Sequence, residues 1–219
     1  MTTTSIRQQI LDRLSPGGPD RFWTVRDFSD LGADPQSVDR ALLRLVDDGE
    51  LRRVRRGLYW RGRRSRFGMM WPDDLTLARR IADVPGVGPA GLLAANVLGL
   101  STQVPGVPSF AVPRRAPRSP ASFRFVDRAG RRGRVTQRLN PVEVAVLEVL
   151  GDWDRVVELP RDRAVALLCQ QAADGAVRPD RLALSASSEP TSVRAGLDNV
   201  FGTELEQGRS GRVRSLVDT

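Results

Sequence analysis

The stretch ADPQSVDRALLRLVDDGELRRVRRGLYWR, residues 33–61, decides the fold of the first part of this chain. It opens with Asp34, a residue type that caps helices, and with Pro35, which is favoured in the first helical turn. The apolar residues that follow recur at the spacing of one face of an amphipathic helix, and they are Val38, Ala41, Leu42, Leu45 and Val46. The sequence therefore predicts a helix that begins at Pro35 and ends before Gly49.

A short basic hairpin is predicted directly after this helix. Two segments rich in β-forming residues, 51–55 and 58–61, flank a turn at Arg56 and Gly57. Residues 51–66 contain no acidic residue and eight arginines, at positions 52, 53, 55, 56, 61, 63, 64 and 66. A phosphate backbone is the simplest partner for such a cluster, because each contact releases counterions. The alternative is a charged face that meets only solvent.

Two further helices are predicted upstream, over residues 6–14 and 25–31. Apolar residues at helical spacing mark the first, and Thr24 and Gly32 are suited to cap the two ends of the second. Three helices followed by a basic hairpin indicate a winged helix-turn-helix over residues 1–66, an architecture that usually binds DNA.

The solvent-facing residues near the start of the third helix are placed to reach base edges in the major groove, and the hairpin arginines to reach phosphate or the minor groove. The candidate DNA-binding residues are Gln36, Ser37, Arg40, Arg44, Arg53, Arg55 and Arg56. Asp39 would repel phosphate. It must therefore contact a cytosine amine, pair with Arg40 or Arg44, or point away.

Composition agrees with a polyanionic partner and excludes several kinds of active site. The 219 residues carry a net charge of +8, and all 34 basic residues are arginine, which also fits a GC-rich genome. The chain has no histidine, no lysine and a single cysteine, Cys169, so it lacks the residues of a Ser-His-Asp triad, a zinc cluster or a P-loop. Asp152 and Asp154 resemble the paired aspartates of nucleotidyltransferases, without the Gly-Ser loop that precedes them. We expect no catalytic residue, no metal and no cofactor.

No signal peptide and no apolar run of about 20 residues is visible in the sequence. We therefore expect a cytoplasmic protein with no membrane partner.

A second domain is predicted over residues 72–206, after a change in composition between 63 and 73, and a mobile tail over 207–219. It is expected to be mostly helical with a small antiparallel sheet, so the whole chain belongs to the α+β class. The predicted strands are 110–112, 123–126 and 135–139. The predicted helices are 73–82, 89–98, 141–150, 162–173, 179–186 and 190–201.

The sequence does not decide the role of two features of this domain. The segment VPGVGPA, residues 84–90, resembles the hairpin of helix-hairpin-helix proteins, which holds a DNA phosphate, and it also fits a simple interhelical turn. A basic belt could extend a DNA footprint, face an acidic protein or an RNA, or form a solvated edge. The belt consists of Arg114, Arg115, Arg118, Arg124, Arg128, Arg131, Arg132, Arg134 and Arg138.

Three motifs together resemble the AbiEi-type antitoxins of bacterial toxin–antitoxin systems, including their mycobacterial relatives. They are RALLRLVDDGELRRVRRGLYW, the WPDD that follows it, and GPAGLLAANVLGLSTQVPG, and the resemblance runs from Ile6 to about Trp153. It implies an antitoxin that represses its own operon at repeated half-sites on double-stranded DNA, with two copies bound there, and that neutralises, directly or indirectly, a cognate nucleotidyltransferase-like toxin. The alternatives are a winged-helix transcriptional regulator with a ligand-sensing or oligomerisation domain, and an enzyme that acts on nucleic acid.

Overall fold

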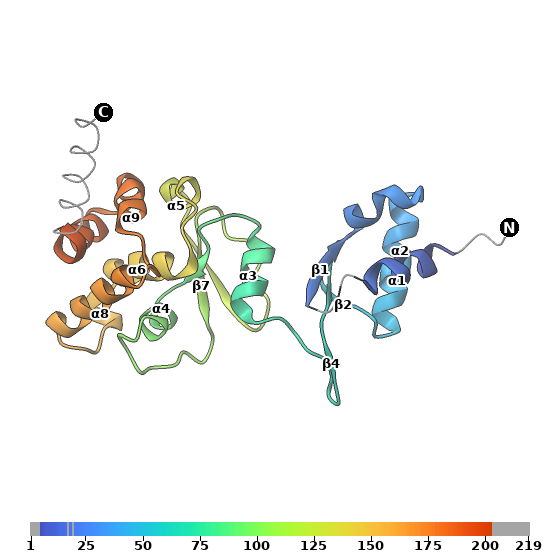
Figure 1. Ribbon diagram of the computed structural model, residues 1–219, viewed down its shortest axis with the longest axis horizontal. Helices are drawn as coiled ribbons and strands as arrows, with labels where there is room; N and C mark the ends of the chain where they lie inside the picture. The colour runs from blue at the N-terminus through green and yellow to red at the C-terminus, as the bar shows by residue number, and fades with distance from the viewer. Residues whose placement is uncertain (1–4, 17, 19, 203–219) are drawn as a thin grey trace. The chain divides into compact units, whose positions relative to one another are not determined.

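The computed structural model describes residues 5–16, 18 and 20–202, and its chain divides into two compact units, unit 1 (Met1–Asp73) and unit 2 (Asp74–Thr219) (Figure 1). Both units mix helices with small sheets, which confirms the α+β class. The tail predicted over 207–219 lies outside the described residues. Within the described ranges, every helix is too short or too polar to cross a lipid bilayer.

Unit 1 contains the three predicted helices and the predicted hairpin. The helices are α1 (Ile6–Leu14), the 3-10 helix η1 (Val25–Leu31) and α2 (Pro35–Asp47). A three-stranded antiparallel sheet in the order β1-β3-β2 consists of β1 (Arg21–Thr24), β2 (Arg52–Arg55) and β3 (Leu58–Arg61). A second hairpin, of β4 (Arg64–Ser65) and β5 (Gly68–Met69), follows directly. Strand β1 and the β4–β5 hairpin are additions to what the sequence predicted.

Side-chain caps explain where the helices of unit 1 begin. The Asp34 carboxylate accepts a hydrogen bond from the Ser37 N–H at 2.9 Å, which satisfies one free donor at the start of α2. The Asp27 carboxylate accepts from the Thr24 backbone N–H at 2.6 Å, at the start of η1. Three residues therefore join η1 to α2, the short connection that the sequence predicted.

One small core holds unit 1 together. Helix α2 contributes Val38, Ala41, Leu42 and Leu45, and these side chains pack with buried residues of α1, η1 and the sheet. Burial of this face leaves the opposite face of α2 to solvent. The core residues are Ile10, Leu14, Trp23, Phe28, Val38, Ala41, Leu42, Leu45, Leu51 and Tyr59.

Unit 2 surrounds the buried helix α6 (Pro141–Gly151), in which every residue from Glu143 to Leu150 is buried. The other helices are α3 (Asp74–Ala82), α4 (Leu92–Val97), α5 (Arg132–Thr136), α7 (Trp153–Val156), α8 (Arg161–Ala173), α9 (Pro179–Ser185), the 3-10 helix η2 (Ala186–Ser188) and a helix over 191–202. The strands are β6 (Gly88–Pro89), β7 (Ser109–Val112) and β8 (Arg124–Asp127).

The sheet of unit 2 differs from the prediction in two respects. Its order is β6-β7-β8, with β6 antiparallel and β8 parallel to β7, so the sheet is mixed. The segment 135–139 is not a strand, because its first two residues are the end of helix α5 and the remaining three form the turn after it. Helix α5 packs against α9 so closely that a Cβ at Gly133 would lie 2.6 Å from the Ser185 carbonyl oxygen. Tertiary packing decides the local structure at this point.

The segment 84–90 does not form a phosphate-binding hairpin. Gly88 and Pro89 form strand β6, which pairs with β7, and residues 86–90 are all buried. A Cβ at Gly88 would lie 2.7 Å from the Pro141 carbonyl oxygen, so this backbone packs directly on α6. Its glycines serve a close approach inside the core of unit 2.

Candidate nucleic-acid interface

The exposed face of α2 carries one polar stripe. Gln36, Arg40 and Arg44 are spaced four residues apart and all three are exposed, so they lie in line over about 12 Å of helix. The Arg40 Nε donates to the Gln36 carbonyl oxygen at 3.3 Å, which holds this side chain along the first turns. Ser37 lies on the flank of the stripe and is only partly exposed. The structure therefore brings three of the four candidate base-contacting residues to one solvent-facing line.

The hairpin presents a second basic group. Arg53 and Arg55 in β2 and Arg56 at the following turn are all exposed. Within residues 5–16, 18 and 20–202, none of the three forms an ion pair with an acidic side chain. Their guanidinium donors are therefore available to an outside anion.

Other arginines of the cluster at 51–66 support the fold. The Arg61 guanidinium donates to the Leu14 carbonyl oxygen at the end of α1. Arg63 pairs with Asp20 and Arg64 with Glu50, each at 2.8 Å. The cluster thus contains arginines with a partner in unit 1, of which Arg63 and Arg64 remain 71% and 58% exposed, and exposed arginines with no acidic partner among the described residues.

Asp39 has a partner that the sequence did not suggest. The hydroxyl of Tyr59, on β3, donates to Asp39 Oδ1 at 2.7 Å, which joins the hairpin to the N-terminal half of α2. Burial raises the pKa of Tyr59, and the bond to Asp39 raises it further. The carboxylate therefore points toward the sheet. The available signal was that Tyr59, the only tyrosine of the chain, lies in a predicted strand beside this helix.

The N-terminus of α2 is already occupied by a carboxylate. Hydrogen bonds from the side chain and backbone of Ser37 lower the pKa of Asp34, so this group stays ionised. A phosphate approaching the first turn would meet that charge, and phosphate contacts are better served by the hairpin arginines. Residues 1–66 contain 14 arginines and 9 acidic residues, a net charge of +5.

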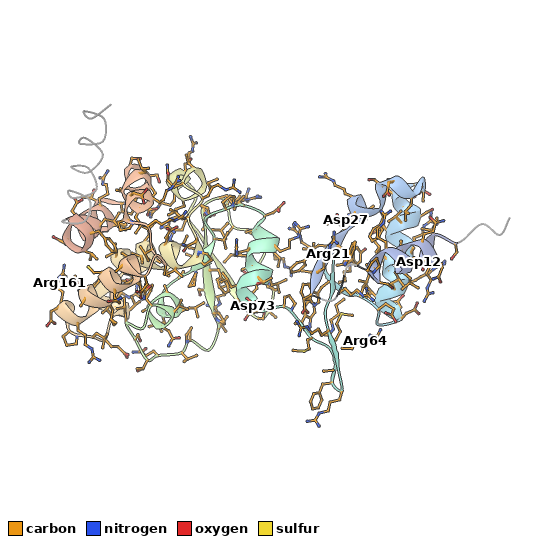
Figure 2. All side chains as sticks on the ribbon, viewed as in Figure 1. Asp12, Arg21, Asp27, Arg64, Asp73 and Arg161 are labelled. Carbon is orange, nitrogen blue, oxygen red and sulfur yellow. The ribbon has the colours of Figure 1, made fainter. Side chains whose placement is uncertain are left out.

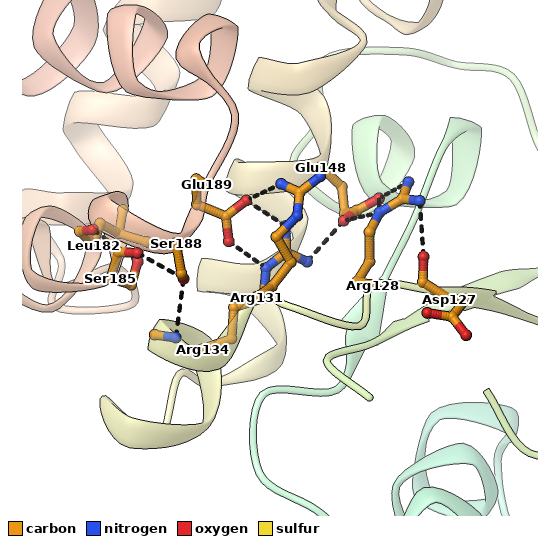
Figure 3. A network of polar contacts seen from close by, with 10 residues as sticks. Asp127, Arg128, Arg131, Arg134, Glu148, Leu182, Ser185, Ser188 and Glu189 are labelled. Carbon is orange, nitrogen blue, oxygen red and sulfur yellow. Dashed lines mark hydrogen bonds and ion pairs between the residues drawn. The ribbon is translucent and has the colours of Figure 1, made fainter. Parts of the chain in front are cut away.

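The basic belt of unit 2 does not form one surface. Arg128, Arg131 and Arg134 bind the carboxylates of Glu148 and Glu189, as Figure 3 shows. Arg134 is 1% exposed and donates to both carboxylates, at 2.7 Å to Glu148 Oε1 and 2.7 Å to Glu189 Oε1. The exposed members of the belt are Arg114, Arg115, Arg118, Arg124, Arg132 and Arg138.

Opposite charges keep this buried network ionised. Burial disfavours the charged form of Arg134, but its hydrogen bonds to Glu189 and its proximity to Glu148 raise its pKa above the usual value. Burial likewise opposes ionisation of Glu148, and its contacts with Arg128 and Arg134 nevertheless lower its pKa. The network joins α5, α6 and the segment before the helix over 191–202, and removal of one partner would leave a buried charge less well neutralised.

A cavity of about 390 Å³ lies beside the same network. Arg128, Arg131 and Arg155 line it together with Ser109 and Ser192. Asp152 also lies at its edge, 3.7 Å from Arg155, whereas Asp154 is exposed on α7. Among the described residues, no group of three or more cysteine or acidic side chains is arranged to hold a metal ion.

The chain is similar to one protein family and to a solved structure. Residues 9–111 match DUF6088, a family of unknown function. No curated protein matches the sequence. Among solved structures, the crystal structure of the RV2827C protein from Mycobacterium tuberculosis is similar, with 20% sequence identity and a TM-score of 0.47 over 91% of this chain and 77% of that chain.

Proposed function

We propose that unit 1 is a winged helix-turn-helix that binds double-stranded DNA. In this proposal α2 enters the major groove with Gln36, Arg40 and Arg44 toward the base edges, and the β2–β3 hairpin contacts the flanking backbone. The observation that carries the proposal is the exposed arginine group at Arg53, Arg55 and Arg56, which has no acidic partner among the described residues. On a surface that meets only solvent, three adjacent like charges repel one another and add no stability to the fold.

We further propose that the chain is an antitoxin that represses its own operon and neutralises a cognate nucleotidyltransferase-like toxin. Support comes from the resemblance of its motifs to AbiEi-type antitoxins. The division into two compact units, each with its own core, agrees with separate sites for DNA and toxin.

Co-expression of the neighbouring toxin gene with the wild-type chain and with two altered forms of it tests this proposal. A variant with Arg53→Ala, Arg55→Ala and Arg56→Ala should lose repression of a reporter driven by its own promoter and still rescue growth. A chain cut after Asp73 should bind the promoter and fail to rescue. Rescue by the truncated chain, or the absence of a toxin gene beside this one, would contradict the antitoxin assignment.

The cavity in unit 2 favours a second candidate, a transcriptional regulator that senses a small anionic molecule. Four arginines, Arg128, Arg131, Arg134 and Arg155, line a space of about 390 Å³ beside the two acidic residues Glu148 and Asp152, and this volume is within the range of small-molecule sites. Thermal unfolding of the full chain with a panel of phosphate-bearing metabolites tests this candidate. A ligand should raise the melting temperature of the wild type and have less effect on Arg155→Ala, whose side chain is 83% exposed.

A further inference from the structure

The β4–β5 hairpin has a feature that the fold does not explain. Phe67, at its tip, is 82% exposed, and it lies beside Arg66, whose guanidinium carbon is 4.7 Å from the centre of the phenyl ring. A bare aromatic ring at the end of a narrow basic hairpin adds no stability to unit 1. Met70 and Trp71, directly after this hairpin, are also exposed, by 55% and 47%, and a group of exposed apolar side chains marks a contact site.

The base of the hairpin is firmly attached to unit 1. The Trp60 indole N–H donates to the Met70 carbonyl oxygen at 2.8 Å, and the Arg64 guanidinium donates to the Gly49 carbonyl oxygen at 3.0 Å. A Cβ at Gly62 would lie 2.2 Å from that Met70 oxygen, so only glycine permits the approach of the two segments. Figure 2 labels Arg64 at the start of this projection.

The tip is shaped by its own hydrogen bonds. The Ser65 hydroxyl donates to the Gly68 carbonyl oxygen at 3.0 Å and accepts from the Phe67 N–H at 3.1 Å. Because Ser65 pairs with Gly68, Phe67 lies across the turn from Arg66, so at about 3.3 Å per residue the tip projects roughly 7 Å past Arg64. The backbone that carries the aromatic ring is therefore fixed in a projecting turn before any partner binds.

The two hairpins of unit 1 lie at opposite ends of α2. In the β1–β3 register Thr24 pairs with Leu58 and Arg21 with Arg61, so the β2–β3 turn and the start of β4 are at opposite ends of the sheet. Tyr59 contacts α2 near its start, through Asp39, whereas Arg64 contacts Gly49, just past its end. Each hairpin therefore lies near one end of α2, from where it could reach the DNA backbone and minor groove next to a helix placed in the major groove.

We propose that the β4–β5 hairpin is a second DNA-contacting element, in which Phe67 inserts between base steps in the minor groove and bends the duplex. This inference rests on the proposed DNA-binding function. Apolar wedges that enter the minor groove partly unstack a base step and kink the duplex by about 20–90°. Arg66 supplies the adjacent positive charge that such a narrow groove attracts.

The test uses the full chain and a 30-bp duplex, in roughly the size range of bent sites, recovered by that chain from a random library and labelled with a dye at each end. Energy transfer between the dyes reports the bend, and a titration gives the Kd. We expect the wild type to shorten the end-to-end distance. Phe67→Ala should leave the duplex straighter and bind about 5- to 150-fold more weakly, the range for loss of one base–aromatic stack.

Three variants serve as controls. Phe67→Leu keeps an apolar wedge and should retain most of the bend. Val104→Ala removes another apolar side chain, 79% exposed in unit 2, and should change nothing. Arg66→Ala should reduce the slope of log K against log salt concentration by about 1, whereas Phe67→Ala should leave it unchanged.

The outcomes separate this inference from the function on which it rests. If Phe67→Ala binds and bends the duplex as the wild type does, the wedge proposal is wrong and the DNA-binding proposal stands. Failure of the wild-type chain to recover any duplex would overturn both. Because Phe67 is exposed, its replacement leaves the core intact, and circular dichroism of the variant checks that it folds.

Discussion

Replacing Tyr59 with phenylalanine removes one hydroxyl and leaves the buried ring, so the change isolates the bond between β3 and α2. That hydroxyl donates to Asp39 Oδ1 at 2.7 Å. A hydrogen bond to a charged group contributes roughly 1.5–3 kcal/mol, and its loss is smaller here because water reaches the partly exposed Asp39 carboxylate. We expect Tyr59→Phe to lower the free energy of unfolding of unit 1 by about 1–2 kcal/mol.

Urea unfolding of residues 1–73, followed by tryptophan fluorescence, measures this loss. Asp39→Asn is the matched control, because its amide oxygen can still accept from Tyr59, and it should lose less stability than Asp39→Ala. A loss below about 0.3 kcal/mol in Tyr59→Phe would refute the argument that this bond fixes the hairpin against the helix.

The same bond has a consequence at high pH. Burial and Asp39 raise the pKa of Tyr59 above its usual value near 10, so the protonated folded form is favoured. The resulting stabilisation is complete below about pH 10 and is lost as the pH rises through the raised value. Tyr59 is the only tyrosine, so its phenolate absorption reports this titration alone. A midpoint near 10 in the folded chain would contradict the buried contact.

Three further results are expected. Arg40→Ala should cost about 1–3 kcal/mol at the preferred DNA site and much less on random duplex, whereas Arg55→Ala should weaken both alike in competition binding assays. Glu189→Ala should lower the free energy of unfolding of unit 2 by about 3–5 kcal/mol in thermal melts, because it removes one of the two carboxylates that neutralise the buried Arg134 guanidinium. The pKa of Glu158 is lowered to about 2, chiefly by the Thr102 N–H, so its stabilisation is present above about pH 4.5 and is lost as the pH falls through about 2. The urea midpoint of the wild type should therefore exceed that of Glu158→Gln above about pH 4.5, and the two midpoints should converge as the pH falls to about 2.

Local signals account for the elements that the sequence predicted well. Helix α2 was predictable because its cap at Asp34, its apolar spacing and its stop before Gly49 all lie within one short segment. The β2–β3 hairpin followed from β-forming residues on both sides of a glycine turn. Strand β1 was missed, although its Phe22 and Trp23 are strand-forming residues, because its pairing partner β3 lies more than thirty positions later in the chain.

Long-range partners explain what the sequence did not reveal. The density of arginines after Leu51 indicated a cluster that contacts phosphate, yet Arg61 and Arg63 bind Leu14 and Asp20, more than forty positions earlier. Arg134 lies in a segment with strand-like composition, and its partner Glu189 is 55 residues away. No local pattern encodes such a pairing, because the requirement to neutralise a buried charge arises only after the chain has folded.

If the exposed arginines of the β2–β3 hairpin bind DNA phosphates, the salt dependence of duplex binding must depend on these three side chains. Affinity of the full chain for duplex DNA should fall linearly in a plot of log K against log salt concentration, and the combined Arg53→Ala, Arg55→Ala and Arg56→Ala variant should reduce that slope by about 2.7. A control variant with Arg161→Ala, Arg163→Ala and Arg194→Ala removes the same charge from exposed positions on helices of unit 2 and should keep the wild-type slope. A wild-type slope in the hairpin variant, or no duplex binding by the wild type, would contradict the claim.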